Sequence, residues 1–217
     1  MKWFDTNFFK LNPSKCHLLV PKHSDESFLR VGNETIKAKS SVKLLGLNID
    51  QNLNFNEHVT TLCKKASQKV HALARIAPFI DNDKRKVLMK AFVESQFSYC
   101  PLLWMYHNRS VNNRINMIHE RALRIAYNDT ASTFQELLDK DNSVTIHEKN
   151  IQRLATEIYK TKNNLNPSFM KEIFCSTTPP YCLRNTNTFQ NSNPKTVYYG
   201  KETIVFRGPT IWSNCTR

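Results

Sequence analysis

Lysine and arginine side chains gather in the middle of this sequence. Between His58 and Tyr127, twelve of them stand against four aspartates and glutamates, a local excess of eight positive charges. The whole chain of 217 residues has a formal net charge of +13 and an isoelectric point near 9.6. Such an excess attracts polyanions, so we expect nucleic acid as the partner ahead of an anionic membrane surface. A basic face that only keeps the protein soluble is the simpler alternative.

Acidic, cysteine and histidine residues do not form a catalytic or metal-binding pattern. Six cysteines occur without a Cys-x-x-Cys pair, so zinc has little support. There is no Gly-x-Ser-x-Gly, no glycine loop for phosphate and no His-Glu-x-x-His, which disfavours a hydrolase or metalloenzyme. We interpret the closely spaced acidic pairs as helix caps and solvated groups; they are Asp25 with Glu26, Asp81 with Asp83, and Asp139 with Asp141.

Cysteine usage and apolar patterning indicate a compartment. The N-terminus lacks the apolar run of a signal peptide, and no apolar stretch of about eighteen residues occurs. We interpret the cysteines as reduced thiols. We therefore expect an intracellular protein, nuclear or cytoplasmic, that is neither secreted nor bound to a membrane.

The sequence pattern of residues 1–55 is typical of short strands and turns. Gly32 and Asn33 separate residues 28–31 from residues 34–37, which predicts a hairpin with a two-residue turn. Residues 11–16 are predicted to form a turn-bounded strand. Residues 42–49 are predicted to form a longer strand, in which Gly46 marks a bulge or a close backbone approach.

From Asn56 onward, apolar residues recur every three or four positions, which predicts helices. The first covers about residues 59–77 and ends before Pro78. The second begins at Asp81 or Asn82 and ends before Pro101. A third covers about residues 111–125. The inner face predicted for the second helix consists of Val87, Leu88, Ala91, Phe92 and Ser95.

The last third of the chain begins helical and then changes. Ser132 and Thr145 each open a capping-box pattern, which predicts a short helix and a longer one interrupted by Pro167. After Phe174 the sequence turns to Thr, Asn and Pro, and β-like runs at residues 196–199 and 203–206 predict a loose hairpin. The predicted fold class is therefore α+β: short N-terminal strands, a mostly helical body and a small β-like tail.

Several short blocks in this order resemble the C-terminal part of non-LTR retrotransposon reverse transcriptases of the jockey-like and chicken-repeat-like groups. The blocks cover nearly the whole chain, and their order is more specific than any one of them. They are Trp3 with Leu-Asn-x-x-Lys at residues 11–15, Leu-Gly-x-x-Ile-Asp at 45–50 with a histidine-led basic helix to Lys69, Tyr-x-x-x-x-Trp at 99–104, Arg-Ala-x-Arg at 121–124, Tyr-x-Leu-Arg at 181–184, and Tyr-Gly, Arg-Gly-Pro and Trp ending at Trp212.

This resemblance implies three regions. Residues 1–55 correspond to the end of the polymerase palm, residues 56–130 to a thumb-like helical region, and residues 131–217 to a C-terminal helical region with an irregular or hairpin tail. A thumb follows the template–primer duplex and needs spaced cations that contact phosphates without reading sequence. The implied partners are an RNA–DNA hybrid or another nucleic acid, and the fingers and palm portion that would complete the polymerase.

The resemblance also implies roles for individual residues. Lys15 aligns with a palm lysine thought to protonate the leaving pyrophosphate, because an ammonium is both an acid and a cation near departing phosphates. Gly46 belongs to a segment resembling the primer grip, which holds the 3′ end of the growing strand. The implied phosphate contacts form two stripes: Lys64, Lys65, Lys69 and Arg75 in the first, and Arg114, Arg121 and Arg124 in the second.

The family's catalytic carboxylates have no counterpart in this sequence. The Ala-Asp-Asp turn and the earlier aspartate that hold two Mg²⁺ ions are missing, so we expect no metal site, no cofactor and no polymerisation by this chain alone. Mg²⁺ is expected only for the complete polymerase. On this view both ends are truncated.

Two alternatives to a polymerase fragment remain open. One is a non-enzymatic nucleic-acid-binding or protein-interaction protein derived from a transposon, and the other is a decayed remnant without function.

Overall fold

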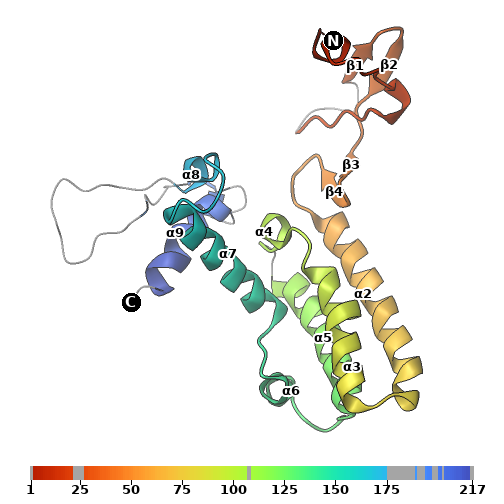
Figure 1. Cartoon of the computed structure of the whole chain (residues 1–217), viewed down its shortest axis with the longest axis vertical. Coiled ribbons are helices and arrows are strands. Elements are labelled where there is room, and N and C mark those ends of the chain that lie inside the picture. Colours follow the sequence, from red (N-terminus) through yellow and green to blue (C-terminus); the bar gives the residue numbers. More distant parts are fainter. Residues whose placement is uncertain are drawn as a thin grey trace, which may run out of the picture. The chain divides into compact units, whose positions relative to one another are not determined.

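The structure is a computed structural model of the chain, and it forms a mixed α+β protein that is mostly helical (Figure 1). Contacts divide it into two compact units, Met1–Thr61 and Leu62–Arg217. The α+β class expected from the sequence is confirmed, with two small antiparallel sheets. The residues described are 2–21, 27–106, 109–174, 189, 194–196, 200–201 and 203–215.

The predicted hairpin of the first unit is confirmed. Strand β1 (Phe28–Val31) pairs antiparallel with β2 (Glu34–Lys37), and Val31 lies opposite Glu34. Gly32 takes a φ of 62°, which glycine adopts at little cost in a two-residue turn.

The prediction of one strand over residues 42–49 is wrong. Strand β3 (Ser41–Leu44) and strand β4 (Leu47–Asp50) form a second antiparallel hairpin. Leu45 and Gly46 take φ values of 47° and 92°, so the chain reverses between them. Two consecutive positive φ values are those of a type I′ turn, whose twist matches that of paired strands. Gly46 therefore marks a turn rather than a bulge.

The strand predicted over residues 11–16 is also not formed. After the short helix α1 (Lys2–Thr6), residues Pro13–Lys15 make a single 3-10 turn, η1. The Asn12 side chain accepts a hydrogen bond from the Ser14 backbone N–H at 3.1 Å. Pro13 fixes its own φ and has no N–H to donate, so this local cap replaces strand pairing.

Helix α2 (Asn56–Ile76) matches the first predicted helix and is followed by the 3-10 turn η2 (Ala77–Phe79). The Asp50 carboxylate fixes the loop that leads into α2, because it accepts hydrogen bonds from the backbone N–H groups of Asn52, Asn54 and Phe55 at 2.8–3.2 Å. The expected apolar face is buried: Val59, Leu62, Ala66, Val70, Leu73 and Ala77.

The second predicted helix begins as expected, but its helical turns end at Phe97 rather than at Cys100, and its inner face was predicted wrongly. Asp81 caps α3 (Asn82–Leu88), and the chain then continues through the π-helix η3 (Met89–Val93) and the 3-10 turn η4 (Glu94–Phe97). The core receives Met89, Val93 and Phe97, whereas Val87 is 66% exposed. A π turn and a 3-10 turn change the rotation per residue, so a constant period of 3.6 selects the wrong face.

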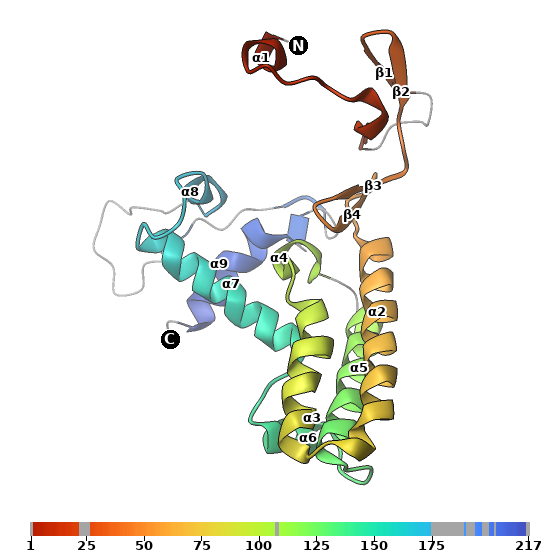
Figure 2. The same cartoon turned by 45° about the vertical axis from the view of Figure 1, so that its right-hand side comes forward.

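Helix α4 (Pro101–Trp104) precedes α5 (Arg109–Tyr127), the third predicted long helix. Both views show α2, α3 and α5 side by side (Figures 1 and 2). Helices α6 (Phe134–Asp141) and α7 (Ile146–Lys162) both open with capping boxes. The first box uses Thr133 with Glu136, one residue beyond the predicted pattern, and the second uses Thr145 with Glu148 as predicted.

The β-like tail expected at residues 203–206 is instead helical. After α8 (Met170–Ile173), helix α9 (Ile204–Cys215) packs against α7. Ile204, Ile211 and Trp212 contact a buried cluster that contains Leu154, Ile158, Phe174 and Phe189. Their spacing is helical, but the β-branched run at its start favoured a strand. The predicted segments at residues 181–184 and 197–199 lie outside the described residues.

Candidate nucleic-acid interface

Helix α2 presents a surface of cations without acidic neighbours. Lys64, Lys65, Lys69 and Arg75 are all exposed, and no acidic residue follows Glu57 in the helix. The described part of the chain offers Lys64, Lys65 and Arg75 neither a hydrogen bond nor an ion pair. The Lys69 ammonium lies 5.6 Å from the centroid of the Phe92 ring, an attraction that leaves its N–H donors free.

These cations follow two lines along the helix. Lys64 and Arg75 share one line with His71, since the spacings of seven and four residues correspond to two turns and one turn. Lys65 and Lys69 are four residues apart on an adjacent line. The Lys64 line lies on the side of the helix away from the buried apolar residues, and the Lys65 line lies next to them, so packing holds the helix while the charged ends remain in water.

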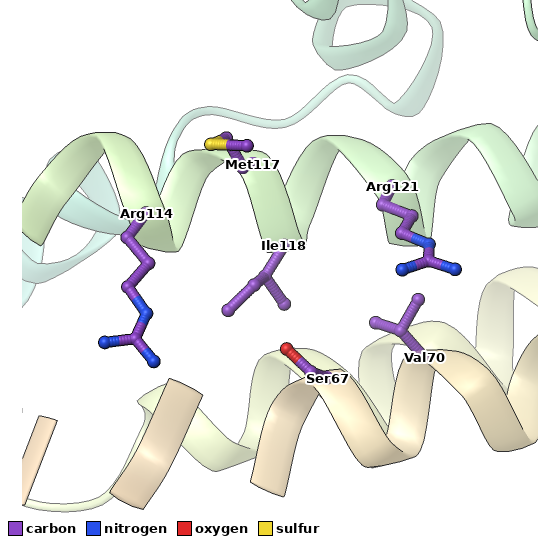
Figure 3. Close-up of a pocket in the computed structure, with 6 residues that line it drawn as sticks. All are labelled: Ser67, Val70, Arg114, Met117, Ile118 and Arg121. Carbon is purple, nitrogen blue, oxygen red and sulfur yellow. The ribbon is translucent and has the colours of Figure 1, made fainter. Parts of the chain in front are cut away.

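Helix α5 adds two of the three predicted arginines to this surface. Arg114 and Arg121 are seven residues apart on one face of α5, and Figure 3 shows both leaving the helix on the side of α2. Between them, a groove of about 220 Å³ is lined by Ser67 and Val70 of α2 and by Met117 and Ile118 of α5. Neither arginine has a hydrogen bond or ion pair within the described residues.

Cys63 lies near Arg114 and is 1% exposed. Burial raises the pKa of the Cys63 thiol, and the positive charge of Arg114 offsets only part of that rise. The thiol is therefore neutral at pH 7 and is no nucleophile, because the reactive form is the thiolate. Arg114 remains available to a ligand from outside.

The third predicted arginine, Arg124, is engaged within the protein. Its guanidinium donates to Glu120 at 2.7 Å and to the backbone carbonyl of Thr130 at 2.8 Å. The ion pair spans one turn of α5, and the carbonyl bond ties down the segment after the helix. The structure thus brings Arg114 and Arg121 together with α2 but gives Arg124 intramolecular partners.

Acidic side chains of the second unit pair with other cations. Glu94 accepts a hydrogen bond from Lys149 at 2.8 Å, and the buried Asp141 lies 3.2 Å from the Lys90 ammonium. Further ion pairs join Lys84 with Asp81, Lys86 with Asp83, Lys140 with Asp129, and Lys160 with Glu157. Six exposed cations of α2 and α5 that lack an acidic partner within the described residues are together called the α2–α5 basic surface: Lys64, Lys65, Lys69, Arg75, Arg114 and Arg121.

The other two predicted site residues lie in the first unit. Lys15 is exposed at the end of the turn η1, and Gly46 is exposed at the tip of the β3–β4 hairpin. Among the residues described, no group of three or more His, Cys, Asp or Glu side chains is placed to hold a metal ion.

The acidic pairs interpreted as caps divide into two groups. Asp81 does cap α3, since its carboxylate accepts the Lys84 backbone N–H at 2.8 Å. Asp141 was predicted wrongly: it is buried, and Tyr127 donates to it at 2.9 Å. Burial and this hydrogen bond raise the pKa of Tyr127 to about 12. Asp25 and Glu26 lie outside the described residues.

No family model, curated protein or solved structure matches the chain. Its functional assignment therefore depends on its own residues and geometry. In the described residues, no helix is long and apolar enough to cross a membrane.

Sequence reasoning identified the cations but missed the groove between them. Ser67, Val70, Met117 and Ile118 come from two helices some fifty residues apart in sequence. One signal was present: Met117 and Ile118 lie between Arg114 and Arg121, and Met117 is 69% exposed.

Proposed function

We propose that the second unit binds the sugar–phosphate backbone of nucleic acid, without reading its sequence, through the α2–α5 basic surface. One observation carries this proposal: within the described residues, six exposed cations on two neighbouring helices lack acidic partners, while the acidic side chains Glu94, Asp141, Asp129 and Glu157 of the same unit pair with other cations. Unpaired cations lose little when they contact phosphate, because no intramolecular ion pair has to break.

We propose further that this binding serves reverse transcription. The support is the ordered set of sequence blocks that resemble non-LTR retrotransposon reverse transcriptases. On this proposal α2 and α5 act as thumb helices along an RNA–DNA hybrid, and the Gly46 turn and Lys15 belong to the end of the palm. The two-metal carboxylates would come from a separate portion of the polymerase, so this chain alone supplies binding and no chemistry.

A charge-reversal experiment tests the binding. The variant Lys64→Glu, Lys65→Glu, Lys69→Glu is compared with Lys84→Glu, Lys171→Glu, Lys201→Glu, which makes the same change in formal charge at exposed positions outside α2 and α5. Fluorescence anisotropy with a labelled RNA–DNA hybrid is expected to show at least a roughly hundredfold loss of affinity in the first variant and a much smaller loss in the second.

Two other results would change the conclusion. Equal losses in both variants would show that only net charge attracts the hybrid, as for a generally solvated basic protein. Unchanged affinity in the first variant would move the contact to Arg114 and Arg121 of α5. Circular dichroism of both variants verifies that the helices remain folded.

A further inference from the structure

The groove between α2 and α5 has an apolar lining that phosphate binding does not use. Val70 is buried in its floor, Ile118 is half-buried, and Met117 is exposed at its rim. Phosphate oxygens gain nothing from contact with such side chains, since burying them there removes their water without returning a hydrogen bond. The groove is therefore suited to an uncharged, partly apolar group that accompanies the phosphates.

The size of the groove limits that group. Its volume of about 220 Å³ exceeds the roughly 150 Å³ of an apolar cavity that holds one benzene ring, and it is smaller than the roughly 300 Å³ at which sites for drug-sized ligands begin. A single ring system with a few attached atoms fits this range. The Ser67 hydroxyl in its wall can donate or accept one hydrogen bond.

Two cations bracket the groove. Arg114 and Arg121 lie about 10 Å apart along the axis of α5, given the rise of 1.5 Å per residue, and Ile118 lies between them (Figure 3). Each guanidinium can bind a phosphate through two parallel hydrogen bonds. A ligand that has a ring in the middle and an anion on each side matches this arrangement.

We propose that the groove holds one unpaired nucleoside of a single-stranded segment, with the phosphates on its two sides bound by Arg114 and Arg121. The inference rests on the proposed function and adds to it a preference for a nucleotide outside a duplex. In a duplex the base is stacked and paired, whereas an unpaired base can leave the strand and enter a protein pocket.

An acidic amphipathic peptide is the other ligand with an apolar middle and two anions. The surroundings favour nucleic acid, because Lys64 and Arg75 extend the positive charge along α2 before and after the groove residues Ser67 and Val70. A strand of nucleic acid has a further phosphate for each of these cations. A short peptide with two carboxylates would leave them without a partner.

A substitution that fills the groove with a larger side chain tests the proposal. Ser67→Leu fills the space without removing a charge, and Gln68→Leu adds the same side chain at the next, exposed position outside it. With a labelled ten-nucleotide oligo(dT), Ser67→Leu is expected to weaken binding about tenfold, or about 1.4 kcal/mol, and Gln68→Leu less than twofold. Gln68→Leu should also bind an RNA–DNA duplex as the unchanged chain does.

The second readout needs no substitution. In the full chain with isotope-labelled methionine methyl groups, oligo(dT) is expected to shift the Met117 signal, while those of the buried Met89 and Met105 stay in place.

Binding of oligo(dT) without a Met117 shift, or with equal affinity in Ser67→Leu, would overturn the groove proposal and leave the proposed function intact. A Met117 shift with a glutamate-rich amphipathic peptide, at equal or higher affinity than oligo(dT), would also overturn it. Failure of both oligo(dT) and duplex to bind would overturn the two proposals together.

Discussion

At the scale of single residues, Glu94 connects three parts of the second unit. Its carboxylate accepts hydrogen bonds from Lys149 of α7 at 2.8 Å and from His119 of α5 at 3.3 Å. Since an ionised carboxylate can only accept, the His119 Nε2 atom must carry the proton. Burial raises the pKa of Glu94, but these two partners lower it more, to about 2. The acidic group is therefore ionised in the folded protein at neutral pH.

Glu94→Gln is expected to lower the free energy of unfolding by roughly 2–3 kcal/mol at pH 7, because Lys149 and His119 lose a charged partner. The folded pKa of Glu94 lies below its ordinary value of 4.5, so its stabilising effect is present above about pH 4.5 and is lost as the pH falls toward 2. Urea denaturation at pH 7 and pH 3 should show the difference between the two proteins shrinking by about half at pH 3.

The matched control for this prediction is Asp83→Asn. The Asp83 side chain is 94% exposed and lies 3.4 Å from Lys86, so its loss is expected to change stability by less than about 0.5 kcal/mol. An effect of Glu94→Gln no larger than that of the control would show that the pair with Lys149 contributes little. Sequence reasoning could not find this site, since Glu94 and Lys149 are 55 residues apart.

At the scale of secondary-structure elements, the β3–β4 turn places a leucine in a backbone conformation that leucine disfavours. Leu45 has a φ of 47° and is 82% exposed, although leucine is strained at positive φ. The first central position of a type I′ turn favours asparagine, and glycine follows it here at position 46. A leucine at this place is explained neither by packing nor by turn preference.

Leu45→Asn is expected to stabilise the hairpin by roughly 0.5–1 kcal/mol, because asparagine tolerates the left-handed conformation. Amide hydrogen exchange of the β3–β4 residues should slow correspondingly. Leu44→Asn is the control: residue 44 is the last residue of strand β3 and pairs with Leu47, a strand position where asparagine is unfavourable, and exchange there should become faster. Faster exchange in Leu45→Asn would mean that the exposed leucine side chain itself holds the turn.

Elements also differ in how well a sequence pattern predicts them. Helices α2 and α5 followed from their apolar spacing, and the β1–β2 hairpin from its Gly-Asn turn. The inner face of residues 82–97 did not, because a π turn interrupts the helix at Met89. Helix α9 was missed because its packing against α7 and the buried cluster around Ile158 overrides the local preference for strand at its start.

At the scale of the whole molecule, the net charge of +13 resides partly in cations that have no partner. If all six cations of the α2–α5 basic surface contact phosphates, the logarithm of the affinity for an RNA–DNA hybrid should fall with the logarithm of salt with a slope of roughly −5. A shallower slope would reduce the number of phosphate contacts accordingly.

Arg75→Gln is expected to make this slope less steep by about one, because one counterion fewer is released on binding. The control is Lys84→Gln, whose ammonium is 72% exposed but pairs with Asp81 at 2.8 Å. It should leave the slope unchanged. Anisotropy titrations across a salt series measure both variants. Equal changes in the two would show that paired and unpaired cations contribute alike, contrary to the proposed interface.

Local patterns in the chain were sufficient for the main helices, for the first hairpin and for the list of cations, since periodicity, turn residues and charge are properties of neighbours in sequence. The tertiary structure decided which cations pair with distant acids, since Lys149 lies against Glu94 and Lys90 against Asp141, while Arg114 and Arg121 have no acidic partner within the described residues. It also decided that two arginines of α5 face Ser67 across an apolar groove. Ion pairs and cavities depend on distances between segments far apart along the chain, and such distances arise only from packing.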